Sequence, residues 1–128
     1  MNLIVGIADM KVTNDPEVVL ITYSLGSCIG VTIYDPLARV GGLLHFMLPD
    51  SAIDKEKAKK TPGMFADSGI PLLFREAYRL GAEKRRLQVK LAGGAQILDD
   101  SGFFNIGKRN YMALRKIFWM NNVLTTSE

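Results

Sequence analysis

A chain of 128 residues predicts a single domain with a real hydrophobic core, and its 48% hydrophobic and 23% charged residues are ordinary for a globular protein. The net charge is only +3, and the short groups of Lys and Arg have few aromatic residues beside them. We therefore interpret them as solvated surface and expect no nucleic-acid partner. A single cysteine excludes an internal disulfide and is typical of a protein of the reducing cytoplasm. The first residues lack the basic start of a signal peptide. No apolar run approaches the ~20 residues that span a membrane.

The first half of the chain predicts β-strands. Runs rich in β-branched and apolar residues predict four of them, over residues 3–7, 18–25, 29–34 and 40–48. The third strand ends at the turn signal Asp35-Pro36, and the fourth ends at Pro49-Asp50-Ser51.

A loop and a helix follow these strands. The stretch 52–64 is polar and rich in lysine and contains a Pro-Gly pair, so we expect a loop there. A helix is predicted from residue 67 or 68 to residue 80, with Gly81 as its stop. Because Pro71 has no amide hydrogen, we expect this helix to begin close to it. The apolar stripe of the helix consists of Leu72, Leu73, Ala77 and Leu80.

The end of the chain predicts one more strand and a second helix. The strand covers 86–92 and is closed by Gly93-Gly94, and the helix covers 110–120. No repeat, linker or low-complexity tract interrupts the chain. The predicted fold class is therefore α+β, with a β-rich core of packed mixed sheets and two main helices.

The only cysteine and the only histidine lie on neighbouring predicted strands. Cys28 follows Gly26-Ser27 and opens one strand, and His45 lies in the next. A thiol and an imidazole are the minimum for a nucleophile with its base. By the alternation of strand side chains, Cys28 falls on the small, polar face of its strand. A nearby imidazole would accept the thiol proton, and the thiolate–imidazolium pair would favour ionisation of the cysteine.

Two further features would complete such a site. An imidazole needs a third group to fix its orientation, and the hydroxyl of Thr22 on the polar face is the candidate. Gly26 allows a sharp turn, so that the N–H groups of Ser27 and Cys28 can form an oxyanion hole. Acyl chemistry on an amide, ester or thioester would follow. One Cys and one His are too few ligands for a zinc site, so we expect no metal and no cofactor.

From spacing alone, a structural interpretation of these residues is the commoner one. A lone cysteine is most often a small buried hydrophobe. His45 has Leu44 and Phe46 beside it, as a core histidine would, and Thr22 is a good strand former. An unrelated domain with a buried cysteine and histidine therefore stays open at this point.

Five segments of the chain carry a resemblance to a known family. They are Thr22-Tyr23-Ser24-Leu25-Gly26-Ser27-Cys28, Asp35-Pro36, His45-Phe46-Met47-Leu48-Pro49-Asp50-Ser51, Ala92-Gly93-Gly94-Ala95 and Asn105-Ile106-Gly107-Lys108-Arg109-Asn110. Each is weak by itself, but the ordered set spans nearly the whole chain. It resembles the CheD family, the chemoreceptor glutamine deamidases of bacterial and archaeal chemotaxis.

The resemblance implies a fold similar to CheD and to deamidating-toxin-like cysteine hydrolases. It also implies a protein-glutamine glutaminase that acts on methyl-accepting chemotaxis receptors through a Cys–His–Thr triad. Carried over to this sequence, Cys28 would be the nucleophile, His45 the base and Thr22 the orienting hydroxyl. Selected glutamines on the cytoplasmic helices of the receptor would become glutamates through an acyl-thioester, with release of ammonia.

A second partner follows from the same resemblance. The family binds CheC, a phosphatase of the phosphorylated response regulator, and raises its activity. The alternative function is therefore a non-catalytic or weakly catalytic partner of a CheC-type phosphatase. Family members usually continue beyond the second helix into further strand-forming sequence. We expect residues 1–128 to form a single CheD-like domain that lacks this segment.

Overall fold

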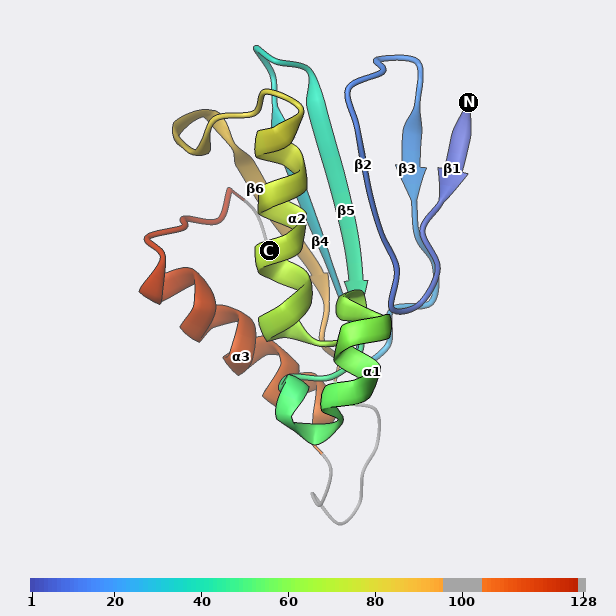
Figure 1. Ribbon diagram of the computed structural model, residues 1–128, viewed down its shortest axis with the longest axis vertical. Helices are drawn as coiled ribbons and strands as arrows, with labels where there is room; N and C mark the ends of the chain where they lie inside the picture. Colours follow the sequence, from blue (N-terminus) through green and yellow to red (C-terminus); the bar gives the residue numbers. More distant parts are fainter. Residues whose placement is uncertain (96–104, 127–128) are drawn as a thin grey trace.

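The computed structural model of the protein describes residues 1–95 and 105–126. The prediction of an α+β fold with mixed sheets is confirmed (Figure 1). The strands are β1 (Asn2–Ile4), β2 (Met10–Thr13), β3 (Val19–Ile21), β4 (Ile29–Asp35), β5 (Val40–Phe46) and β6 (Gln88–Gly93). The helices are α1 (Lys55–Lys60), α2 (Ala66–Arg79) and α3 (Ile106–Met120).

The larger sheet is antiparallel and has the strand order β2-β5-β4-β6, so β4 and β5 are its central strands. These two strands pair along their whole length, with Ile29 opposite Phe46 and Gly30 opposite His45. The smaller sheet is the parallel pair of β1 and β3, which lies beyond β2 (Figure 1). Because buried side chains specify the register of β4 and β5, they also specify what faces His45.

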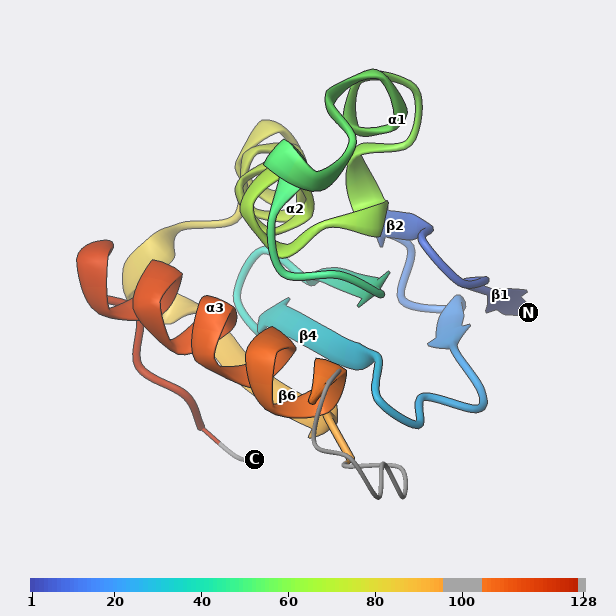
Figure 2. The same ribbon diagram turned by 90° about the horizontal axis from the view of Figure 1, so that it is seen from below.

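The hydrophobic core lies between the larger sheet and helices α2 and α3. Both helices are on the same side of this sheet (Figure 2). The buried residues of this layer are Ile29, Val31, Ile33, Leu44, Phe46, Ile70, Leu73, Phe74, Ala77, Leu114 and Phe118. Since successive strand residues point to opposite faces, Gly30 and His45 lie on the face turned away from the helices.

The N-terminal part of the chain differs from the prediction in three ways. The strand predicted over 3–7 is observed as the shorter β1 over Asn2–Ile4. The predicted strand over 18–25 is shorter, because Ser24 and Gly26 adopt positive φ angles of 57° and 52° and turn the chain. The strand β2 is not among the predicted ones. It has four residues, including Lys11, and it forms by pairing with β5, a tertiary contact that its local pattern does not reveal.

The prediction of a loop over 52–64 is wrong. This stretch contains α1 and, around it, two short 3₁₀ turns at Ser51–Ile53 and Pro62–Met64. The side chain of Asp54 caps α1 by accepting a hydrogen bond from the Lys57 N–H at 3.0 Å. Because no residue of α1 is buried, no apolar periodicity marks this helix in the sequence.

Helix α2 begins at Ala66, one residue before the earlier of the two predicted starts, so Pro71 lies in its second turn and not in its first as expected. Pro71 is exposed, and its ring forgoes only the hydrogen bond to the carbonyl of Asp67. The buried face of the helix is also rotated by about one position from the predicted stripe. It consists of Ala66, Gly69, Ile70, Leu73, Phe74 and Ala77.

One boundary of α2 agrees with the prediction, and one boundary of α3 does not. Gly81 follows α2 as predicted, with a φ of 105°, and its N–H donates to the carbonyl of Tyr78 in a Schellman motif. Helix α3 begins at Ile106, four residues earlier than predicted.

Within the described ranges, none of the helices has the length and apolar character that crossing a bilayer requires.

A buried carboxylate joins the β4–β5 turn to the segment after α2. Asp35 has no exposed surface, and it accepts hydrogen bonds from the N–H groups of Leu37, Ala38 and Glu83 and from the guanidinium of Arg86. The bond from Arg86, more than the backbone donors, holds the pKa of Asp35 well below its usual range. The ionised form of this carboxyl is therefore part of the folded state.

We expect Asp35→Asn to lower the midpoint of thermal unfolding by several degrees at pH 7. Because the pKa of Asp35 is lower in the folded than in the unfolded chain, its contribution is complete above the unfolded value of about 4 and is lost as the pH falls below it. The gap in midpoint between wild type and Asp35→Asn should thus be constant from pH 7 to pH 5 and shrink in acid. Glu17→Gln, at an exposed carboxyl, is the control. A gap that widens in acid contradicts this role.

Candidate functional site

The structure brings the predicted histidine and threonine into contact. His45 has no exposed surface, and its Nδ1 lies 2.8 Å from Oγ1 of Thr22, just past the end of β3. The space for this contact comes from Gly30, which is opposite His45 and has no side chain. A Cβ added at Gly30 would lie 3.8 Å from Cγ2 of Thr22 and 3.3 Å from Cδ2 of Leu25, so these two side chains cover it.

The hydrogen bonds of Thr22 determine which nitrogen of His45 carries the proton. The Thr22 hydroxyl has one hydrogen, which it donates to the carbonyl of Val5 at 2.7 Å. Its oxygen must then accept from Nδ1–H of His45. In the neutral ring this leaves Nε2 as a bare acceptor. Nε2 is buried and has no hydrogen-bond partner among residues 1–95 and 105–126.

Cys28 immediately precedes β4, the strand that pairs with β5 and its His45. Gly94 N–H donates to the Cys28 carbonyl at 2.8 Å, one position beyond the β4–β6 ladder. Continued alternation of side chains would place Cys28 on the side of Gly30, diagonal to His45. The half-buried thiol makes no hydrogen bond to Nε2 in this structure.

The protonation of this pair differs from the prediction that the imidazole promotes ionisation of the thiol. Burial raises the pKa of the Cys28 thiol. Burial also lowers the pKa of the His45 imidazole. Both shifts favour the neutral forms, because a low-dielectric environment disfavours any charge. Neither shift contains an attraction between the two groups.

The loop that carries Cys28 is fixed through its carbonyl groups. Three successive carbonyls accept hydrogen bonds from distant parts of the chain: Gly26 from Ala95 N at 2.9 Å, Ser27 from Asn110 Nδ2 at 2.9 Å, and Cys28 from Gly94 N at 2.8 Å. The backbone at Gly93 passes so close that an added Cβ would lie 2.3 Å from the Cys28 carbonyl oxygen. From the sequence, Gly93-Gly94 was predicted to close a strand and Asn110 to begin a helix, and both belong to segments that carry the family resemblance, but neither was predicted to contact the Cys28 loop.

A hydrogen bond within the loop removes one of the two donors of the predicted oxyanion hole. The N–H of Cys28 was predicted to be available to an oxyanion, but it donates to the carbonyl of Leu25 at 2.7 Å. The N–H of Ser27 has no acceptor within the described part of the chain. In a trans peptide the N–H points opposite to the preceding C=O, and Gly26 directs its carbonyl to Ala95. Ser27 N–H therefore points away from Ala95.

No metal site accompanies these residues in the part of the chain that the structure describes. Within 1–95 and 105–126, no three His, Cys, Asp or Glu side chains gather closely enough to hold an ion. The chemistry available to the described residues is that of a thiol, a buried imidazole with one bare nitrogen, and backbone donors. Such a set performs nucleophilic acyl transfer.

Comparison with known proteins gives a consistent result. The sequence model of a family described as "CheD chemotactic sensory transduction" matches residues 47–128. A protein of Syntrophus aciditrophicus (strain SB), named "Probable chemoreceptor glutamine deamidase CheD 1", is 61% identical over 127 residues, which are 99% of this chain and 79% of that protein. Its alignment therefore also covers the N-terminal part, which the family model leaves out.

Two further relatives have similar names. A "Probable chemoreceptor glutamine deamidase CheD" of Solibacter usitatus (strain Ellin6076) is 54% identical over 98% of this chain and 75% of its own length. A "Probable chemoreceptor glutamine deamidase CheD 2" of Anaeromyxobacter dehalogenans (strain 2CP-C) is 49% identical over 97% of this chain and 78% of its own length.

Proposed function

This chain belongs to the CheD family, and on that premise we propose that it deamidates glutamine side chains of chemoreceptors to glutamate and releases ammonia. The proposal takes its reaction and substrate from the names of its relatives. The cytoplasmic helices of the receptor would be the substrate, and the cytoplasm the place of action. A glutamate formed in this way adds a negative charge that the glutamine lacked.

One observation supports this function most strongly. The hydrogen bonds of Thr22 to Val5 and His45 favour a proton on Nδ1, which leaves Nε2 as an unpaired acceptor. A base oriented by a third group beside a thiol is the arrangement that activates a nucleophile. A merely structural histidine would be expected to use both ring nitrogens, since a buried polar atom without a partner is destabilising.

In the proposed mechanism the thiol loses its proton only as it reacts. Nε2 of His45 accepts the proton while Sγ of Cys28 attacks the amide carbon of the glutamine, and the negative charge moves to the amide oxygen. The N–H of Ser27 stabilises this oxyanion. His45 then donates the proton to the leaving nitrogen, which departs as ammonia. Water, deprotonated by the same Nε2, hydrolyses the thioester to glutamate and restores the thiol.

Mass spectrometry of a chemoreceptor cytoplasmic domain tests this function. The domain is incubated with the protein, and its peptides are searched for glutamine-to-glutamate conversion above the level of the domain incubated alone. Conversion at particular glutamines supports the proposal. A folded protein that converts none contradicts it, and favours the alternative of a CheC-type phosphatase partner, which is then tested by dephosphorylation of the response regulator in the presence of CheC.

The role of Thr22 has a test of its own. We expect Thr22→Val, which keeps the shape but loses the hydroxyl, to lower kcat about 10- to 100-fold, less than the about 10²- to 10⁴-fold of a general base, because His45 itself remains. Thr22→Ser retains the oxygen and should keep most of the activity. The measurement is the initial rate of ammonia release at saturating receptor. Equal activity of Thr22→Val and wild type would show that His45 needs no orienting hydroxyl.

A further inference from the structure

The described part of α3 contributes one polar side chain that is completely buried. Asn110 has no exposed surface. Its Nδ2 donates two hydrogen bonds, to the carbonyl of Ser27 at 2.9 Å and to the carbonyl of Met47 at 2.8 Å. Its Oδ1 has no partner among residues 1–95 and 105–126. The side chain therefore acts as a double donor between two backbone segments.

The two acceptors make the amide group difficult to replace. Both are backbone carbonyls, and the uncharged Asn110 amide supplies two N–H bonds from one nitrogen to satisfy them. Loss of that group would leave two carbonyls without this donor. A hydrophobic side chain of similar size would fill the space but would satisfy neither carbonyl.

The positions of the two acceptors relate Asn110 to the reaction. Ser27 immediately precedes Cys28, and Met47 follows His45 by two residues. Each carbonyl belongs to a segment that leaves the β4–β5 ladder at the end of the sheet where the thiol and the imidazole lie. A single planar group thus connects the segment that carries the nucleophile with the segment that carries the base.

We propose that Asn110 is a positioning residue that sets the distance and angle between Cys28 and His45, an inference that rests on the proposed function. It touches neither reacting atom. It acts through the carbonyls of Ser27 and Met47, in concert with the backbone donors Gly94 and Ala95 on the other two carbonyls of the loop.

A purely structural role in anchoring α3 explains the contacts less well. The helix is already anchored by Leu114 and Phe118, which are completely or almost completely buried in the core. Burying an amide is unfavourable unless its hydrogen bonds compensate for the lost water, and half of this amide has no described partner. The packing of α3 against the core therefore does not by itself account for an amide at this position.

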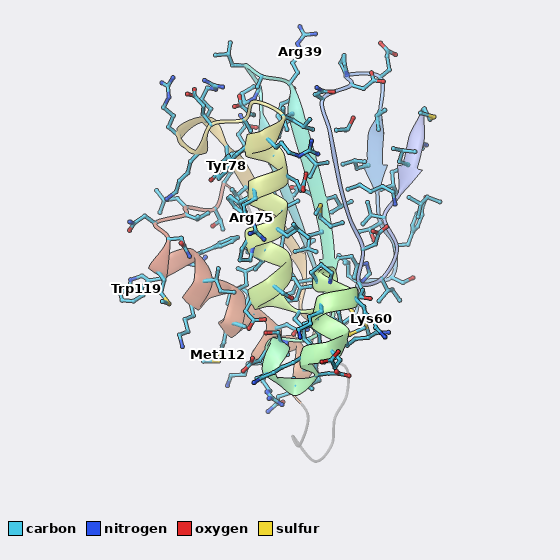
Figure 3. The ribbon with its side chains drawn as sticks, viewed as in Figure 1. Arg39, Lys60, Arg75, Tyr78, Met112 and Trp119 are labelled. Carbon is cyan, nitrogen blue, oxygen red and sulfur yellow. The ribbon has the colours of Figure 1, made fainter. Side chains whose placement is uncertain are left out.

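The test combines Asn110→Ala with Asn110→Asp, which keeps the side-chain volume but offers at most one donor. Both are expected to lower kcat for receptor deamidation about 10- to 100-fold with KM changed less than about threefold, because a misplacement of about 1 Å reduces a positioned reaction to that extent. Two controls lie on the same helix. Leu114→Val perturbs the core without touching either carbonyl, and Met112→Ala changes an exposed side chain on the outside of α3 (Figure 3).

A second readout does not need the receptor. Alkylation of Cys28 by iodoacetamide is measured in wild type and Asn110→Ala, each with and without His45→Ala. In a correctly positioned pair His45 accelerates alkylation, and this acceleration should be at least threefold smaller in the Asn110→Ala background, as coupled residues require. The cycle is repeated with Asn110→Asp, so that it does not depend on one variant folding.

The outcomes separate this inference from the proposed function. If wild type converts glutamine and both Asn110 variants retain its kcat, the inference is overturned and the function stands. If wild type converts no glutamine, the function fails, but the dependence of alkylation on His45 still decides whether Asn110 positions the pair. An equal effect of His45→Ala in all backgrounds overturns the inference. A loss of kcat in Leu114→Val as large as in Asn110→Asp also overturns it.

Discussion

Replacing Cys28 by alanine is expected to reduce glutamine conversion by about 10⁴-fold or more, down to the rate without enzyme. The thiol supplies the only covalent step of the proposed mechanism, and neither His45 nor Ser27 can replace it. Since Cys28 is only half-buried, the variant should stay folded. The measurement is quantitative mass spectrometry of receptor peptides, over an incubation in which wild type reaches completion.

Cys28→Ser is the matched control for this prediction. It keeps a hydroxyl of similar size at the position of Sγ but has almost no anionic form near neutral pH, so it should be nearly as inactive as the alanine variant. Circular dichroism and the unfolding midpoint of both variants should match those of wild type. Receptor conversion by Cys28→Ala at even a tenth of the wild-type rate would exclude this residue as the nucleophile.

Replacing His45 by asparagine is expected to lower kcat about 10²- to 10⁴-fold, the usual contribution of a general base. The asparagine amide nitrogen occupies about the position of Nδ1 and can still donate to Thr22, while the bare nitrogen is lost. The change therefore removes the base and preserves the hydrogen bond that supports it. KM should change little, because His45 has no exposed surface with which to bind the receptor.

The pH dependence of the rate should differ between wild type and His45→Asn. Burial lowers the pKa of His45, so wild type should stay active below the ordinary histidine value of about 6.5 and lose activity only in more acidic solution. In His45→Asn the residual rate should follow the thiolate, and rise with pH beyond the ordinary cysteine value of about 8.5, because burial raises the pKa of Cys28. A wild-type acid limb above pH 7 would contradict the assignment of His45 as the buried neutral base.

The sequence predicted the elements that hold the site better than those around it. The alternation of Ile29, Val31 and Ile33 placed β4 correctly, and β5 followed from the next apolar run. The strand β2 and the helix α1 were not predicted, because each is short and neither contains a buried residue. Pairing with β5 and the cap at Asp54 support them instead. Periodicity detects only buried faces.

Within the site, the grouping of residues was easier to predict than their charge states. The contact of Thr22 with His45 follows from residue types that the family resemblance assigned, and the structure contains it. The directions of the pKa shifts of Cys28 and His45 could not be predicted from the sequence, because they depend on how deeply each side chain is buried in the folded protein. The sequence did hold one unused signal: Asn110 precedes Leu114 and Phe118 at intervals of four on the buried stripe of α3, where a polar residue is unusual.

The three hydrogen bonds to the loop around Cys28 have a consequence for the order in which the protein is made. The proposed catalytic side chains all lie in the first 45 residues, but the donors Gly94, Ala95 and Asn110 emerge from the ribosome much later. A nascent chain carries the nucleophile and its base long before it carries the groups that fix them. The site should therefore reach its final geometry only after residue 110 has been synthesised and its segment has packed against the loop.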